Sequence, residues 1–222
     1  LADKLRIWRL RSRSCRGSLA ELYERPHKTT EQYLRDFGFS ERMMDQFFRP
    51  FIGGVFLDES LSVSSRMLEF VIRMFSLGGI AVPADGMAAI PRQLVEQLPH
   101  GSVRLQSSVV QLDGKHVTLA NGASLTGDHI VIATESNAAA RLLNLPELKT
   151  SWKETTTLYY SGPRCHEKYK SLILRGDESG PIQTATIISN VAEEYASGQQ
   201  SLISVSLSPS EETNSEKIDQ LT

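Results

Sequence analysis

Two glycine-containing turns divide the stretch between residues 103 and 134 into short segments that favour a meander. Asp113-Gly114 and Asn121-Gly122 are typical of tight hairpins, because Gly tolerates a positive φ at little steric cost. The apolar or alternating runs around them are Val103–Leu112, Val117–Leu119 and Ile130–Ala133. We therefore predict three consecutive strands between residues 103 and 134, with the last apolar run in the interior of a sheet.

A helix is predicted on each side of this meander. Before it, Gly86 precedes a segment with an apolar residue at every fourth position. These residues are Ile90, Leu94 and Leu98. After it, Ser136 or Asn137 is expected to cap a helix that continues to Leu143.

The first 77 residues have a helical pattern throughout. The expected N-caps are Ser18, Thr29 or Thr30, Ser40, and one of Ser60, Ser62 and Ser64. Gly38 is expected to end one helix and Pro50 to break another. The apolar face of the last helix is predicted to be core, with a pocket for a bulky apolar substrate as the alternative. That face comprises Met67, Phe70, Val71, Met74 and Phe75.

Basic residues dominate the first sixteen positions. They are Lys4, Arg6, Arg9, Arg11, Arg13 and Arg16, against the single acid Asp3. Leu5 and Trp8 fall on one helical face. We expect a solvated basic helix that leads into the domain; the alternatives are a helix at a membrane surface or the end of a transit peptide.

The segment from residue 146 onward is rich in β-branched and aromatic residues. The expected strands are Thr155–Tyr160, Leu172–Leu174, Thr184–Ser189 and Leu202–Leu207. The sequence begins at Leu1 rather than Met and stops shortly after a helix-start pattern at residues 214–221. We therefore expect a part of a longer protein, truncated at both ends.

Composition excludes some classes of protein. A net charge of -2 gives no case for nucleic-acid binding. Cys15 and Cys165 lie far apart and are expected to be free thiols in a reducing compartment, with a single disulfide as the alternative. No apolar run approaches the ~18 residues of a membrane span.

Residues for acid–base or metal chemistry do not cluster in the sequence. The histidines are His27, His100, His116, His129 and His166, and their spacing fits no metal site. The adjacent carboxylates Asp58-Glu59 and Glu193-Glu194 are interpreted as surface charge, because sequence neighbours point apart. No catalytic residue is identified, no metal site is expected, and a G-x-G-x-x-G phosphate loop is absent from the sequence.

Three stretches nevertheless resemble a known superfamily. They are DGMAAIPRQL, the strand end VVQL, and VIATESNAAARLL. The chain resembles the central part of FAD-dependent flavoproteins of the amine oxidase, protoporphyrinogen oxidase and phytoene desaturase superfamily. The resemblance implies an α/β fold (α+β overall): an FAD-binding dinucleotide-fold segment with a β-meander at 78–145, interleaved with a helical substrate-domain part at 1–77 and a sheet part at 146–222.

The resemblance also implies a site and an activity. Val109 matches the position whose main chain contacts the adenine end of FAD, Ala133 and Thr134 match the strand end near the nucleotide, and Gly86 matches a turn facing the flavin. The expected function is oxidation of a small apolar or amine-bearing substrate, with a non-catalytic scaffold or assembly factor as the alternative. Location in a plastid (chloroplast) or the bacterial cytoplasm is a further expectation. Peripheral membrane contact is the alternative given above for the basic N-terminal segment.

Overall fold

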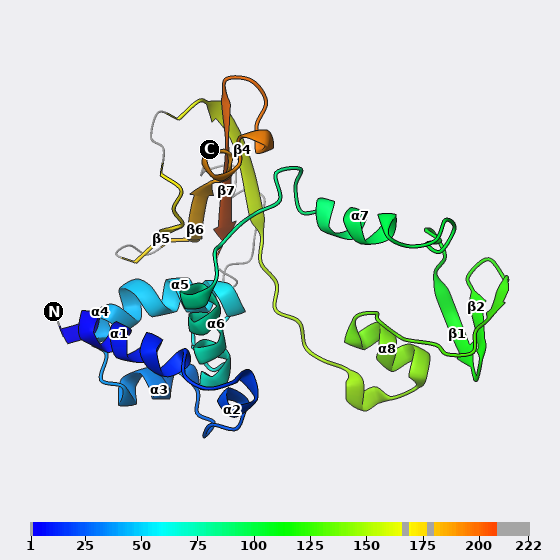
Figure 1. Cartoon of the computed structure of the whole chain (residues 1–222), viewed down its shortest axis with the longest axis horizontal. Coiled ribbons are helices and arrows are strands. Elements are labelled where there is room, and N and C mark those ends of the chain that lie inside the picture. The colour runs from blue at the N-terminus through cyan, green and yellow to red at the C-terminus, as the bar shows by residue number, and fades with distance from the viewer. Residues whose placement is uncertain (1, 166–168, 177–179, 208–222) are drawn as a thin grey trace. The chain divides into compact units, whose positions relative to one another are not determined.

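The computed structural model describes residues 2–165, 169–176 and 180–207. They divide into two compact units (Figure 1). The larger unit combines the described parts of residues 1–88 and 153–222, and the smaller one is Ala89–Trp152. The three-part division expected from the sequence stays a prediction. The chain is a mixed α/β fold whose two sheets are both antiparallel.

Helices make up the first part of the larger unit. They are α1 (Ala2–Ser14), α2 (Leu19–Tyr23), α3 (Thr30–Asp36), α4 (Glu41–Met43), a π-helical turn at Met44–Phe48, α5 (Arg49–Phe56) and α6 (Ser65–Leu77). Local capping chemistry confirms most of the predicted starts. Ser18 forms a full capping box with Glu21. The N-caps of α3, α4 and α6 are Thr29, Ser40 and Ser64.

The prediction that Pro50 breaks a helix is wrong. The chain passes from α4 through the π-helical turn into α5, and Pro50 occupies the first turn of α5. In the π-helical turn the Arg49 N–H donates to the Met44 carbonyl, five residues back. The wider turn accommodates a residue that lacks an N–H and would clash in an α-helical ladder.

A core of aliphatic and aromatic side chains holds these helices together. Its buried members are Leu10, Leu34, Phe39, Met44, Phe48, Ile52, Leu61 and Leu68. Aromatic pairs reinforce it: the Phe39 and Phe48 rings meet edge to face with centroids 4.8 Å apart. Because Leu10 is fully buried, α1 is part of this core and packs against α6.

The buried face of α6 differs from the predicted one. Val71, a member of the predicted face, packs against the core together with Ile72. Leu68 and Glu69, which were not predicted, are buried, whereas Met74 and Phe75 are 40% and 41% exposed. The buried side of α6 therefore overlaps the predicted face only in part and includes the carboxylate of Glu69.

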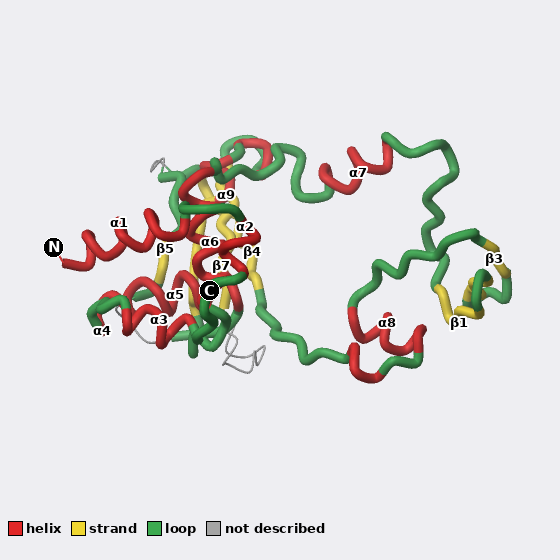
Figure 2. Tube along the Cα trace, turned by 60° about the horizontal axis from the view of Figure 1, so that its bottom comes forward, coloured by secondary structure: helices red, strands yellow, loops and turns green. Residues whose placement is uncertain are grey.

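The sheet of the larger unit has the strand order β4-β7-β6-β5 (Figure 1). Its strands are yellow in Figure 2. They are β4 (Thr157–Pro163), β5 (Ile173–Leu174), β6 (Ile182–Ile187) and β7 (Gln200–Leu207). Between β6 and β7 the chain forms the short helix α9 (Ile188–Val191) and a 3-10 turn at Glu193–Tyr195. All four predicted strands are present, although Ile188 and Ser189 belong to α9. The helix α5 lies against β6.

The smaller unit contains the predicted meander. Its elements are α7 (Ala89–Glu96), β1 (Val109–Asp113), β2 (His116–Leu119), β3 (Ser124–Thr126), α8 (Ser136–Leu143) and a 3-10 turn at Pro146–Leu148. The strands pair in the order β1-β2-β3, and both glycine turns are confirmed. Gly114 and Gly122 have φ values of 56° and 84°.

Two predicted strand segments of the meander are wrong. Residues 103–108 lie outside β1, and Leu105 is 83% exposed. Ile130–Ala133 is not a strand, and Val131 is 87% exposed. A strand requires a hydrogen-bonded neighbour, and no strand in the described residues pairs with either segment.

Two remaining predictions concern a helix near the C-terminus and a membrane-spanning helix. The helix expected at residues 214–222 lies outside the described residues. Within the described part of the chain, no helix is both long enough and apolar enough to span a bilayer.

Candidate functional site

Val109 begins β1, which is an edge strand of the meander. It lies opposite Leu119, while the Ala120 N–H donates to the Ser108 carbonyl at 2.8 Å. In an antiparallel ladder this hydrogen bond makes Val109 and Leu119 a non-hydrogen-bonded pair, whose own N–H and C=O point away from the partner strand. The Val109 main chain therefore faces the outer edge of the sheet.

A bulge next to Val109 breaks the regular pairing of β1. Val109 opposes Leu119 and Gln111 opposes Thr118, which leaves Val110 as an extra residue. Bulges are common at sheet edges and next to binding sites, where they reorient the strand. Val109 itself is half-buried and Val110 is 57% exposed, so β1 is only partly buried.

Ala133 and Thr134 lie on the loop that leads into α8, and both are exposed. The next residue, Glu135, is the N-cap of α8, and its carboxylate accepts the Ala138 N–H at 2.8 Å. The predicted cap at Ser136 or Asn137 is therefore displaced by one or two residues. Because Glu135 already satisfies the N-terminal N–H groups, α8 offers little to a phosphate.

Gly86 lies near the end of the first segment of the larger unit, which runs to Ala88. Its φ of 79° lies in the left-handed region, and its N–H donates to the Pro83 carbonyl at 3.1 Å. No atom lies within 4 Å of the place that a Cβ would take, so the conformation, not crowding, demands glycine here. Gly86 and the three other predicted cofactor residues belong to different units, and their union in one site stays a prediction.

A buried carboxylate, Glu69, is the centre of a polar cluster that the sequence did not indicate. Glu69 is 2% exposed and accepts hydrogen bonds from Arg13 Nε at 3.0 Å, from Arg25 Nη1 and from the Tyr33 hydroxyl. Burial, reinforced by the bond to Glu69, raises the pKa of Tyr33 and keeps it protonated as a donor. The cluster joins α1, α3 and α6.

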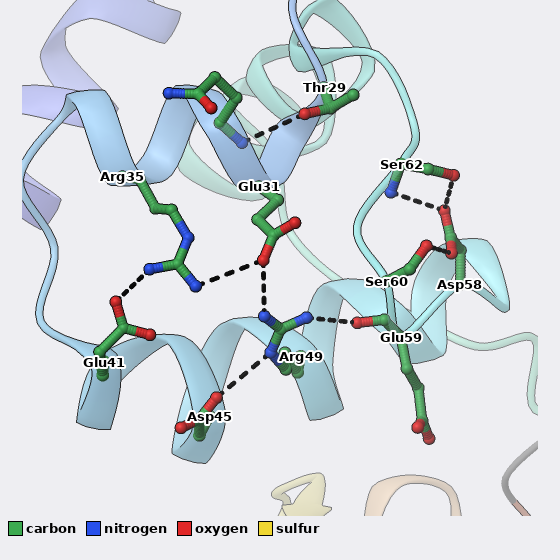
Figure 3. A network of polar contacts seen from close by, with 11 residues as sticks. Thr29, Glu31, Arg35, Glu41, Asp45, Arg49, Asp58, Glu59, Ser60 and Ser62 are labelled. Carbon is green, nitrogen blue, oxygen red and sulfur yellow. Dashed lines mark hydrogen bonds and ion pairs between the residues drawn. The ribbon is translucent and has the colours of Figure 1, made fainter.

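Asp58 is buried, so its interpretation as surface charge is wrong. It is 7% exposed and accepts from the Ser62 N–H at 2.9 Å and from the hydroxyls of Ser60 and Ser62 at 2.5 and 2.6 Å (Figure 3). Lys153 Nζ lies 3.4 Å from its Oδ2. Burial by itself would raise the pKa of Asp58, but these hydrogen bonds and the Lys153 charge outweigh it and lower the pKa.

A second set of ion pairs surrounds Arg49 (Figure 3). Arg49 donates to Glu31 at 2.8 Å, to Asp45 at 3.2 Å and to the Glu59 carbonyl at 2.9 Å. Glu31 is shared with Arg35, which also pairs with Glu41. Each acid in this network meets a base of the same unit. The network therefore fastens α3, α4 and α5 together.

Other chemistry-bearing residues are scattered. In the described residues no group of three or more His, Cys, Asp or Glu side chains is arranged to hold a metal ion. Cys15 and Cys165 are free thiols, as expected. The exposed pair Glu193-Glu194 is surface charge, as predicted. His166 lies outside the described residues.

The architecture defines a class: a mixed α/β chain in which a small antiparallel meander unit is inserted between the helical and sheet parts of a second unit. The chain matches the model of the flavin-containing amine oxidoreductase family over residues 1–165. The chain belongs to this family, which confirms the resemblance read from its sequence. Members of the family are FAD-dependent oxidoreductases.

Two solved structures share the fold over part of their length. The PF1083 protein from Pyrococcus furiosus has a TM-score of 0.67 at 14% identity, over 96% of this chain and 58% of that one. Reduced UDP-galactopyranose mutase has a TM-score of 0.62 at 17% identity, over 91% and 53%. At such identities the likeness shows the fold alone. The chain spans little more than half the length of either structure, and no curated protein matches it significantly.

Proposed function

We propose that this chain is part of an FAD-dependent oxidoreductase that acts on a small apolar or amine-bearing molecule. The family match over residues 1–165 carries the proposal. In it, residues 78–145 belong to the dinucleotide-binding domain and the flanking segments to the substrate domain. A carotenoid-like or amine substrate and a plastid or bacterial cytoplasmic location are the finer parts of the same proposal.

The geometry at Val109 supports a cofactor contact. FAD bound here supplies the acceptor for a hydride from substrate. The part of this chain is to hold the nucleotide, with the outward N–H and C=O of Val109 at the adenine end. The exposed backbone at Ala133 and Thr134 carries small side chains that let a cofactor approach, and Gly86 supplies a turn without a Cβ.

An exposed apolar surface on α5 and α6 supports an apolar substrate. Val55, Met74 and Phe75 are 44%, 40% and 41% exposed. The Phe75 ring lies 5.6 Å from that of Phe51, one helical turn before Val55. Binding sites for small molecules are mainly lined by such side chains.

The test is the flavin content of the protein made from the complete gene. We expect FAD to co-purify in stoichiometric amount. Val109→Pro removes the outward N–H at the first residue of an edge strand, where proline is tolerated. Losing one hydrogen bond of about 1 kcal/mol lowers FAD affinity about fivefold.

Two matched variants separate the main chain from the side chain. Val109→Ile and Val109→Ala change the side chain and keep the N–H, so both should retain flavin. Circular dichroism checks that each variant is folded. If Val109→Pro is folded and its FAD affinity is unchanged, Val109 has only a structural role and does not contact FAD. A folded complete protein without any flavin favours the non-catalytic scaffold instead.

A further inference from the structure

The outer face of α1 exposes two large apolar side chains. Leu5 and Trp8 are 62% and 63% exposed, whereas Leu10 and Ser14 on the inner face are fully buried. The inner face is therefore fixed in the core of the larger unit. Leu5 and Trp8 lie nearly one turn apart on the opposite side, where they form a short apolar ridge.

Cations surround this ridge without matching acids. The exposed basic residues are Lys4, Arg9, Arg11 and Arg13 in α1 and Arg16 just after it, and Arg11 also donates to the Ser76 carbonyl at 3.5 Å. Asp3 is the sole acid in α1, and it is engaged elsewhere: its carboxylate accepts from the Ser40 hydroxyl at 2.6 Å and from Arg6 at 3.0 Å. Arg13 is likewise committed to Glu69. The outer face of α1 thus combines unneutralised positive charge with Trp8 and Leu5.

A shallow depression lies beside the ridge. It is lined by Trp8, Arg9, Ser12, Arg13, Arg16 and Phe37. The Arg9 guanidinium lies over the Phe37 ring, 5.7 Å from its centroid, which orients its donors. Arg guanidinium groups match the geometry of phosphate oxygens well. The depression therefore suits a phosphate group at the level of the exposed indole.

We propose that the outer face of α1 docks on the surface of an anionic phospholipid bilayer. Tryptophan prefers the headgroup level of a bilayer, and Lys and Arg are attracted by anionic lipid. Self-association through this face is disfavoured, because it brings two sets of like charges together. The docking does not depend on flavin binding, and it is superficial: the helix lies on the membrane and does not cross it.

The test is co-sedimentation of the 222-residue chain with vesicles. We expect binding to phosphatidylcholine vesicles that contain phosphatidylglycerol, weak binding to phosphatidylcholine alone, and weaker binding as salt is raised. The triple variant Lys4→Gln, Arg9→Gln, Arg16→Gln should bind roughly 100-fold less tightly, at about fivefold for each cation removed. The control triple Arg92→Gln, Arg104→Gln, Lys149→Gln removes as many exposed cations outside α1 and should bind as the wild type does.

Trp8 provides an internal probe. The second tryptophan, Trp152, is also exposed and is removed by Trp152→Phe. In that background, anionic vesicles should shift the Trp8 emission to the blue, and brominated lipid should quench it. The pair Leu5→Ser, Trp8→Ser should weaken sedimentation, whereas Ile80→Ser, Leu105→Ser, which removes two exposed apolar residues elsewhere, should not.

Three results overturn the proposal. One is no binding to anionic vesicles. Another is vesicle binding that is equally tight in the wild type and the α1 variants, because a different surface of the protein is then responsible for the binding. A third is a wild-type dimer in light scattering that becomes a monomer in Leu5→Ser, Trp8→Ser, since a second copy then covers the face. All altered residues are exposed, and circular dichroism confirms that the variants are folded.

Discussion

At the scale of single residues, pairing decides which charged groups are buried. Glu69 tolerates burial because three donors from distant parts of the chain converge on it. Glu41, by contrast, is an exposed partner of Arg35. The two carboxylates look alike in sequence, but their different environments give them different contributions to the free energy of unfolding.

Replacing Glu69 with Ala should destabilise the larger unit strongly. The change removes the carboxylate that accepts from the half-buried Tyr33 hydroxyl and from the largely buried Arg25, which costs about 3 kcal/mol. The measurement is urea unfolding followed by Trp8 fluorescence in the Trp152→Phe background. Glu41→Ala is the control and should cost under about 1 kcal/mol, because exposed ion pairs contribute little. Equal losses in both variants contradict the assigned role of Glu69.

At the scale of elements, short-range polar contacts determine where helices and turns begin. Asp58 organises the loop between α5 and α6, since it binds Ser60, Ser62 and the Val63 N–H. In the smaller unit, the Asn121 side chain accepts from the Ala123 N–H at 3.0 Å and closes the second turn of the meander. Each of these contacts joins residues only a few positions apart, so the local sequence is sufficient to form the loop or turn.

The loop at Asp58 should make stability depend on pH. The folded pKa of Asp58 is lowered, so its contribution is complete above the unfolded value of about 4 and is lost as pH falls below it. Asp58→Asn should therefore reduce the free energy of unfolding by about 2 kcal/mol at pH 7, as expected for hydrogen bonds to a charged group, and by less at pH 3.

Urea unfolding across this pH range measures the effect. Asp85→Asn, at an exposed loop position, is the control and should follow the wild type at every pH. A wild-type minus Asp58→Asn difference that grows on acidification would refute the sign of the shift.

The second turn of the meander should require glycine at position 122. Gly122 has a φ of 84°, and no atom lies within 4 Å of a Cβ built there. Gly122→Ala should thus suffer only backbone strain, about 1 kcal/mol. Amide hydrogen exchange of residues 109–126 measures it. Gly79→Ala has equal space but no positive φ, and it should leave that exchange unchanged. Unchanged exchange in Gly122→Ala would show that the turn adapts.

At the scale of the whole molecule, we propose that the chain supplies part of a nucleotide site. The meander presents an edge at Val109, but the sequence contains no G-x-G-x-x-G loop to hold a pyrophosphate. The chain spans little more than half the length of each of the two similar structures.

The 222-residue chain alone should bind FAD poorly. The pyrophosphate loop supplies the densest set of N–H donors in sites of this kind. Flavin fluorescence during titration should show no saturable binding in the micromolar range. Free riboflavin, which lacks the adenine and the pyrophosphate, is the control and should behave the same. Tight, stoichiometric FAD binding to the chain alone would refute this account.

The sequence by itself determined the local structure: the caps at Ser18 and Ser40, and the turns at Gly114 and Gly122. It narrowed the cap of α6 to three serines, of which the structure has Ser64. These features depend on contacts within a few residues. It also indicated the family, through motifs in the meander and its flanking helices. The candidate cofactor residues were identified from that resemblance. For one of them, Val109, the structure adds that its main chain faces the outer edge of the sheet.

Only the tertiary structure decided which groups are buried and which strands pair. Glu69 is buried because Arg13, Arg25 and Tyr33, which lie 56, 44 and 36 residues away, converge on it. Ile130–Ala133 has the composition of an interior strand, yet no described strand lies beside it. Burial and pairing are properties of neighbours brought together by folding, and such neighbours leave no local pattern in the sequence.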